Sequence, residues 1–320
     1  MAKIVQCVPN ISEGKDLKII EYIIEPLINQ EGFKLISAEP DQNYHRTVIT
    51  LIGDPDQMIE PLLAFFKRAE EKIDLNKHKG EHPRMGAVDV LPFIPISGVT
   101  IDECISYATL MGEKISKMLN IPVYLYAKAA KQPNRVNLPD IRKGEFEGMK
   151  DKIKDIEWLP DFGPAEIHKT FGCVAVGARN PLIAYNIDLD TSDEKIAGAI
   201  AKAIRQSSGG FQYVQAGPAF IEDKGFVQVT MNILDYKKNP IYRILETVKM
   251  EAKRYHVNVV SSEVVGLLPK ETLVDSIKYY EQVNGIIFNK TMDLDEITHK
   301  AIQYIGLRDF DQLKIIEANL

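Results

Sequence analysis

The same order of strand and helix patterns occurs twice in this 320-residue chain, and it constrains the fold more than any other feature. Short apolar runs predict strands, and apolar residues that recur every three or four positions predict helices. In the first half the order is β-α-β-β-α-β, with strands at 3–9, 33–38, 46–53 and 87–96 and helices at 17–28 and 55–73. This order is typical of the ferredoxin-like split βαβ unit.

The second half repeats the order, although its residues do not repeat those of the first. Its strands are predicted at 182–189, 211–216, 226–234 and 257–265, and its helices at 191–204, 240–255, 270–282 and 293–305. We therefore predict an α/β (α+β) fold of two ferredoxin-like β-α-β-β-α-β subdomains, residues 1–176 and 177–320, with a cleft or tunnel between them.

Local signals refine several of these elements. Pro26 predicts a kink in the first helix or its early end. Thr100 with Glu103, and Thr191 with Glu194, have the spacing of capping boxes at helix starts. A run at 122–126 predicts a strand that extends the first sheet, and 128–154 predicts loop with short helices.

Composition narrows the function classes. The net charge of −6 argues against a general nucleic-acid surface. Three cysteines without a CxxC pair indicate a reducing compartment. The N-terminus lacks a signal-peptide pattern, and no apolar run reaches membrane-spanning length. We expect a cytoplasmic protein that binds neither nucleic acid nor membrane.

One histidine stands out, in the stretch GEHPRMGAVDVLPFIP at 80–95. His82 lies on a glycine- and proline-bounded loop just before a predicted buried strand. It is either a packing or surface histidine or a group for proton transfer, because imidazole titrates near neutral pH. His78 and His82 would share a helix face as a metal pair, but Gly80 and Pro83 oppose a helix, so we predict no metal site.

Two other stretches leave alternatives open. Residues 10–14, NISEG, follow the first strand and are either part of a ligand site or a turn in which Ser12 caps the next helix. The basic residues of 128–143 are either solvated surface or attract an anionic substrate: Lys128, Lys131, Arg135, Arg142 and Lys143. The chain has no phosphate-binding P-loop and no dinucleotide-binding glycine pattern after a strand.

Several blocks together resemble a known family. CVPNISEG at 7–14, the 80–95 stretch, YLY at 124–126, LPDFGP at 159–164, GARNPLIAYNI at 177–187 and VVGLLP at 264–269 are similar to the formiminotransferase domain of glutamate formiminotransferases. The resemblance implies transfer of the formimino group from N-formimino-L-glutamate to tetrahydrofolate, in histidine degradation. It also implies two α/β subdomains, a folate site in a tunnel between them and a homodimer.

The resemblance assigns roles to particular residues. His82 matches the catalytic histidine, and the folate-binding segment matches Gly163, Pro164, Ala165, Glu166, Ile167, His168, Lys169, Thr170, Phe171 and Gly172. Many members have aspartate where this chain has Glu39, and a plainer Asn-Arg where it has His45-Arg46. Because both substrates carry carboxylates, we expect guanidinium groups to bind them. The candidates are Arg46, Arg84, Arg142 and Arg179.

The residues leave the donor open. An enzyme of the same fold could use N-formylglutamate or act on 5-formyltetrahydrofolate, and a non-catalytic folate-binding protein would keep the same pocket. In animals the domain is often fused to a cyclodeaminase, an activity that we expect this 320-residue chain to lack.

Overall fold

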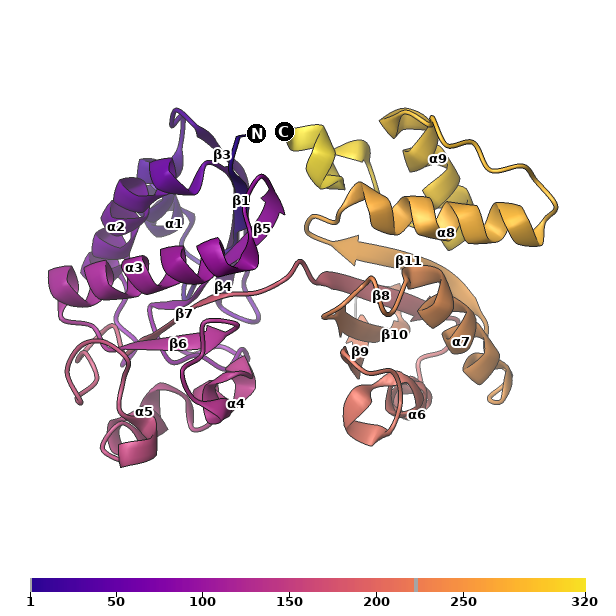
Figure 1. Cartoon of the computed structure of the whole chain (residues 1–320). Helices are drawn as coiled ribbons and strands as arrows, with labels where there is room; N and C mark the ends of the chain where they lie inside the picture. Colours follow the sequence, from indigo (N-terminus) through magenta and orange to yellow (C-terminus); the bar gives the residue numbers. More distant parts are fainter. Residues whose placement is uncertain (1, 222–223) are drawn as a thin grey trace. The chain divides into compact units, whose positions relative to one another are not determined.

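The chain forms two compact units, Met1–Asn180 and Pro181–Leu320, and each has its own sheet and core (Figure 1). The computed structural model describes residues 2–221 and 224–320. The predicted boundary after residue 176 falls inside strand β7 (Val174–Ala178), which pairs within the sheet of the first unit. β7 is not among the predicted strands, because its five residues are all buried and show no polar–apolar alternation.

The first unit contains the predicted β-α-β-β-α-β order. Its elements are β1 (Ile4–Cys7), β2 (Asn10–Ile11), α1 (Leu17–Ile24), β3 (Phe33–Asp41), β4 (Arg46–Gly53), α2 (Pro55–Lys72) and β5 (Val88–Ser97). Three helices and two strands follow: α3 (Ile101–Leu119), β6 (Val123–Ala127), α4 (Leu138–Arg142), α5 (Glu145–Lys152) and β7. The predicted first strand, 3–9, corresponds to β1, which ends at Cys7. A separate short strand, β2, begins after Pro9, which has no N–H to donate to the ladder.

The pairing of the first sheet is that of a ferredoxin-like unit with an extension. β4 lies between β3 and the β1–β2 segment, and β5 lies on the other side of that segment, with every pair antiparallel. β7 then pairs parallel to β5, and β6 pairs parallel to β7. The predicted extension of the sheet by residues 122–126 is therefore confirmed.

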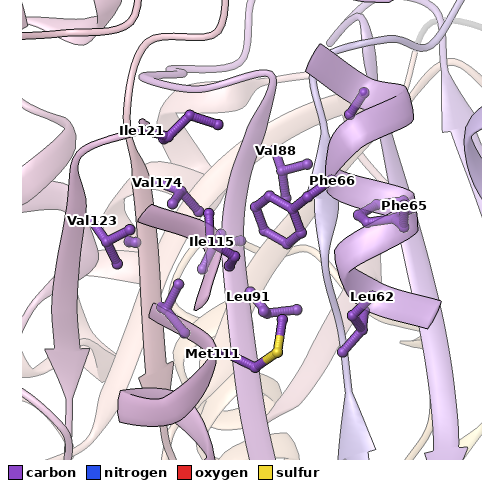
Figure 2. Close-up of a cluster of buried hydrophobic side chains, with 14 of the residues drawn as sticks. Leu62, Phe65, Phe66, Val88, Leu91, Met111, Ile115, Ile121, Val123 and Val174 are labelled. Atoms are coloured by element: carbon purple, nitrogen blue, oxygen red, sulfur yellow. The ribbon is translucent and has the colours of Figure 1, made fainter. Parts of the chain in front are cut away.

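Helices α2 and α3 bury their apolar faces against this sheet (Figure 2). Figure 2 labels Leu62, Phe65 and Phe66 on α2, Met111 and Ile115 on α3, and Val88, Leu91, Val123 and Val174 on the strands. Burying one such side chain contributes about 1.5–3 kcal/mol. This packing fixes the start of β5, just after the loop that carries His82.

Helix starts and ends show which local signals hold. α1 ends at Ile24 and passes into a 3₁₀ turn that contains Pro26, as predicted. Thr100 caps α3 in a capping box with Glu103. The second predicted capping box is wrong: Asp193 caps the helix that follows, because its carboxylate accepts the Lys195 amide.

The second unit contains a four-stranded antiparallel sheet with the strand order β11-β8-β10-β9. Its elements are β8 (Ile183–Leu189), α6 (Glu194–Ile204), β9 (Val214–Ile221), β10 (Phe226–Ile233), α7 (Ile241–Lys253), β11 (Val259–Val265), α8 (Lys270–Val283) and α9 (Leu294–Ile305). β8 lies between β11 and β10, and β9 pairs with the other edge of β10. This is again the ferredoxin-like strand order. Within residues 2–221 and 224–320, no helix is both long enough and apolar enough to cross a membrane.

Candidate active site

His82 lies on the segment between α2 and β5, and the rest of the first unit holds this segment in place. Ser12 donates its backbone N–H to the Ala87 carbonyl and its hydroxyl to the Gly86 carbonyl, each at 2.8 Å. Of the two alternatives for residues 10–14, the turn in which Ser12 caps the next helix is therefore wrong. Asp16 caps α1 instead, and its side chain accepts two amides of the first helical turn. Ser12 is thus part of the support for the His82 loop.

The imidazole of His82 contacts the first residue of β4. Arg46 Nη1 lies 2.6 Å from His82 Nε2. A guanidinium has only donors, so Nε2 is the acceptor and the ring is neutral in this contact. The ring of Tyr44 meets the imidazole edge-on, with centroids 6.1 Å apart. The structure therefore brings together two predicted site residues that lie 36 positions apart in the chain.

Burial and two positive charges act on His82 in the same direction. Burial, followed by the charges of Arg46 and Arg142, lowers the pKa of His82 to about 3. Desolvation and like charge both disfavour the imidazolium form. At neutral pH the ring is therefore uncharged.

Two of the predicted carboxylate-binding arginines already have carboxylate partners. Arg84 is buried and bonds to Glu145 at 2.7 Å and to Glu147 at 2.8 Å. Arg142 bonds through Nε to Asp89, which is 2% exposed, at 2.7 Å. These ion pairs occupy both guanidinium groups, so neither is free to bind a substrate carboxylate.

Arg46 and Arg179 differ from that pair. Among the residues that the structure describes, neither has a carboxylate at ion-pair distance. The Nε of Arg46 is buried and has no hydrogen-bond partner in this part of the chain. Arg179 donates to the Asn180 carbonyl at 3.2 Å, and burial lowers its pKa despite contact with Tyr126. Both groups can therefore still bind an anion.

The predicted folate-binding segment lies against the chain that follows His82. The Phe171 carbonyl accepts the Ala87 N–H at 2.8 Å, and the Met85 carbonyl accepts the Cys173 N–H at 2.9 Å. Between these bonds, Gly86 and Gly172 form a β-bridge. Ile167, Phe171 and Gly172 are buried, whereas the other seven residues of the segment are partly or fully exposed. The structure thus joins two stretches that the sequence indicated separately.

Glu39 occupies a different environment. It is exposed on β3, where it faces Val48 of β4 in the register. No hydrogen bond or ion pair joins its carboxylate to His82 within the described ranges. Of the basic residues of 128–143, Arg135 is 1% exposed and bonds to Asp161 at 2.7 Å, so it supports the fold rather than attracting an anion.

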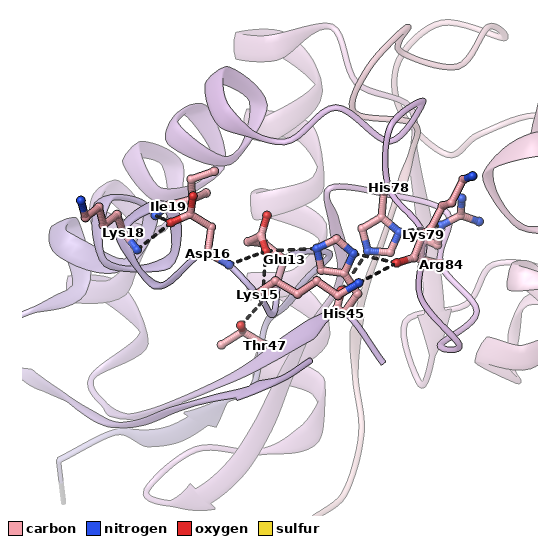
Figure 3. Close-up of polar contacts among 10 residues, drawn as sticks. All are labelled: Glu13, Lys15, Asp16, Lys18, Ile19, His45, Thr47, His78, Lys79 and Arg84. Carbon is pink, nitrogen blue, oxygen red and sulfur yellow. Dashed lines mark hydrogen bonds and ion pairs between the residues drawn. The ribbon is translucent and has the colours of Figure 1, made fainter. Parts of the chain in front are cut away.

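Glu13, His45 and His78 belong to a hydrogen-bonded network that the sequence did not predict (Figure 3). His45 reaches Glu13 Oε1 through Nε2 at 3.1 Å and the Lys79 carbonyl through Nδ1 at 2.8 Å. His78 bonds through Nε2 to the His45 carbonyl at 2.8 Å. These contacts join the loop after β2, the start of β4 and the loop of His82. The 32 or more positions between partners leave no local pattern that would predict them.

Asp89 is the other missed residue, and here the sequence does carry a signal. Its carboxylate interrupts the apolar run AVDVLPFIP, and it is 2% exposed within β5. Oδ1 accepts the Met85 amide at 2.8 Å, and Oδ2 binds Arg142. A charged residue inside a buried strand indicates a partner, because an unpaired buried charge is costly.

Residues 2–221 and 224–320 contain no group of three or more His, Cys, Asp or Glu side chains placed to hold a metal ion. The nearest sequence candidate, the His78–His82 pair, lies on a non-helical segment. His78 uses both ring nitrogens in protein hydrogen bonds, since its Nδ1 accepts from Arg84 at 3.2 Å.

Comparison with known proteins covers nearly the whole chain. Residues 4–179 match the family model described as the formiminotransferase domain, N-terminal subdomain, and residues 184–319 match the formiminotransferase domain model. The chain is 45% identical to a glutamate formimidoyltransferase of Streptococcus pyogenes serotype M1, over 91% of this chain and 97% of that protein. It is 44% identical to a glutamate formimidoyltransferase of Thermoplasma acidophilum, over 88% of this chain and 93% of that protein. A formimidoyltransferase-cyclodeaminase of Rattus norvegicus is 40% identical, and the match spans 53% of its length.

Proposed function

The chain belongs to the formiminotransferase domain family, and from this premise we propose that it transfers the formimino group of N-formimino-L-glutamate to tetrahydrofolate. The products are L-glutamate and 5-formiminotetrahydrofolate. The names of two relatives that match almost end to end support the substrates. The observation that carries the proposal is the uncharged, partly buried imidazole of His82 beside Arg46, a cation without a carboxylate partner in the described chain.

His82 supplies the proton transfers. As the N5 amine of tetrahydrofolate attacks the formimino carbon, Nε2 takes the proton that this amine loses. A new N–C bond forms, and the bond from that carbon to the glutamate nitrogen breaks when His82 returns a proton to the leaving nitrogen. One imidazole thus serves first as base and then as acid, a role worth about 10²–10⁴-fold in rate. Holding two substrates together supplies much of the rest.

The remaining predicted residues receive supporting roles. Arg46 and Arg179 are the arginines that we assign to substrate carboxylates, because Arg84 and Arg142 are already paired. Residues 163–172 are assigned to folate, since they lie along the His82 loop and most are accessible. Glu39 is exposed and available to the pterin. We also expect a cytoplasmic homodimer, and light scattering of the purified protein measures the assembly state.

The test is a transfer assay with purified protein, tetrahydrofolate and either N-formiminoglutamate or N-formylglutamate. We expect the absorbance of the product only with the formimino donor. His82→Ala lowers turnover at least about 100-fold and leaves tetrahydrofolate binding intact. His256→Ala, at an exposed histidine of the second unit, is the control. Near-normal turnover in His82→Ala removes His82 from the mechanism, and folate binding without transfer from either donor overturns the proposed activity.

A further inference from the structure

In the structure, the nitrogen of His82 that would act as the base already has a hydrogen-bond donor. His82 Nε2 accepts a hydrogen bond from Arg46 Nη1 at 2.6 Å. A lone pair that accepts a hydrogen bond from a guanidinium cannot at the same time take a proton from an attacking amine. Something must therefore withdraw Arg46 from His82 before the ring can act as a base.

The charges around the ring favour an anion for this task. Arg46 and Arg142 both act on His82 as positive charges. Asp89 is occupied by the Met85 amide and by Arg142, whereas Asp41 and Tyr44 act on Arg46 only through space. Because burial also lowers the pKa of Arg46, a partner of opposite charge would stabilise this guanidinium.

Arg46 also has an unused hydrogen-bond donor. Its Nη1 points at His82, while its Nε is buried without a hydrogen-bond partner in the described chain. A guanidinium binds a carboxylate through two parallel N–H groups. A carboxylate on the Nε side would take up the unused donor and turn the fork away from the imidazole.

We propose that the α-carboxylate of N-formiminoglutamate binds Arg46 and draws it away from His82 Nε2, so that the base is freed only when this donor is bound. The proposal rests on the proposed function, which supplies the donor. It makes Arg46 a positioning residue that couples donor binding to the release of the catalytic imidazole.

The chemistry of the two substrates selects this carboxylate. In N-formiminoglutamate the α-carboxylate is attached to the carbon that bears the formimino nitrogen, so the anion and the leaving nitrogen are two bonds apart. In tetrahydrofolate the glutamyl carboxylates are separated from N5 by the whole p-aminobenzoyl group. Only the donor can place a carboxylate at Arg46 while its reacting nitrogen is beside the adjacent His82.

The test follows the protonation of His82 by NMR in protein with isotope-labelled histidine, its signal identified by loss in His82→Gln. The probes are N-acetyl-L-glutamate, which cannot react, and 4-acetamidobutyrate, the same molecule without the α-carboxylate. We expect N-acetyl-L-glutamate to raise the titration midpoint of His82 by about one pH unit or more, and 4-acetamidobutyrate to leave it unchanged. Failure of N-acetyl-L-glutamate to bind, or binding without this shift, overturns the proposal.

Variants of Arg46 provide a second readout. Arg46→Gln raises the titration midpoint of free His82 and abolishes the shift with N-acetyl-L-glutamate. In the assay we expect the KM for N-formiminoglutamate to rise at least about tenfold and the KM for tetrahydrofolate to stay unchanged. Arg46→Lys keeps the positive charge but lacks the planar guanidinium that binds a carboxylate through two hydrogen bonds. We therefore expect it to show part of the shift that Arg46→Gln loses. Arg254→Gln, at an exposed arginine of the second unit, is the matched control.

The two proposals fail in different ways. Loss of the formimino-transfer reaction in the wild-type protein would overturn the proposed function, whatever the NMR titration shows. The wild-type protein could instead transfer the formimino group while N-acetyl-L-glutamate leaves the titration midpoint of His82 unchanged. That result would leave the function in place and overturn only the role of Arg46.

Discussion

His45 and His78 stack face to face, with ring centroids 4.2 Å apart and planes 11° from parallel. The two rings have different hydrogen-bond partners. His78 donates from Nε2 to a carbonyl and accepts at Nδ1 from Arg84, so its ring is neutral, and burial lowers its pKa. Both nitrogens of His45 face acceptors, Glu13 and the Lys79 carbonyl, so only a doubly protonated ring satisfies both. Two stacked rings with different hydrogen-bond partners thus lie beside the His82 loop.

This relationship predicts that His45 stabilises the His82 loop. His45→Asn keeps a residue type that tolerates the left-handed backbone at this position (φ +50°), but its side chain cannot bridge Glu13 and Lys79. We expect the free energy of unfolding to fall by about 1–3 kcal/mol, the worth of hydrogen bonds to a charged group. Amide hydrogen exchange should become faster at residues 77–84. Urea denaturation and exchange followed by mass spectrometry measure both effects.

His256 provides the control for this variant. It also has a left-handed backbone (φ +57°), but its side chain is exposed. His256→Asn should leave both the free energy of unfolding and the exchange of residues 77–84 unchanged. Equal behaviour of the two variants would show that the His45 bridge adds nothing beyond its backbone conformation.

The low pKa of His82 predicts a loss of stability in mild acid. Burial and Arg46 hold its pKa at about 3, whereas a histidine in the unfolded chain titrates near 6.5. Between these values the unfolded chain binds a proton that the folded chain does not, so stability falls as the pH drops. The slope is at most about 1.4 kcal/mol per pH unit, and this contribution is constant above pH ~6.5.

Comparison with His82→Gln isolates this effect. The free energy of unfolding of both proteins is measured between about pH 5 and 7, where most carboxylates stay ionised. We expect the wild type to lose stability more steeply towards pH 5 than His82→Gln does. Parallel curves would mean that His82 titrates normally in the folded protein.

Asp89 is predicted to support both the fold and the site. Asp89→Asn removes the charge that pairs with Arg142 and weakens the bond to the Met85 amide. Breaking a buried ion pair by removing one partner costs about 3–5 kcal/mol. Since Asp89 is 2% exposed and Arg142 15%, we expect a loss of about 3 kcal/mol in urea denaturation, with reduced turnover. Asp151→Asn, in the exposed pair with Lys154, should cost less than about 1 kcal/mol, and an equally small loss for Asp89→Asn would contradict the prediction.

Gly172 is predicted to be irreplaceable where the folate segment meets the His82 loop. Its backbone is left-handed (φ +84°), and a Cβ there would lie 2.1 Å from the Met85 carbonyl oxygen. Gly172→Ala must therefore separate the two segments, and we expect it to lower stability by about 2 kcal/mol or more and to weaken tetrahydrofolate binding. Gly217→Ala, where no atom lies within 4 Å of the added carbon, is the control for thermal denaturation and ligand titration. Wild-type folate affinity in Gly172→Ala would separate this contact from the folate site.

The reach of local patterns explains which fold predictions held. The two β-α-β-β-α-β units follow from apolar spacing, and the sheet orders confirm them. The Thr100 capping box was predictable because both partners lie within one helical turn. Ser12 resembles a cap in sequence, but its hydroxyl bonds to Gly86, 74 positions away. The competing caps, Asp16 and Asp193, became evident only from the backbone geometry.

The sequence by itself determined the two-lobed topology and placed His82 on a stiff loop before a buried strand, because apolar periodicity, glycine and proline act over a few residues. Its family resemblance also indicated the reaction. Only the tertiary structure decided which arginines are already paired with carboxylates and that Arg46 donates a hydrogen bond to His82. The four guanidinium groups are chemically alike in the sequence. Their partners lie as many as 63 positions away, and charge pairing depends on distance and burial rather than on spacing along the chain.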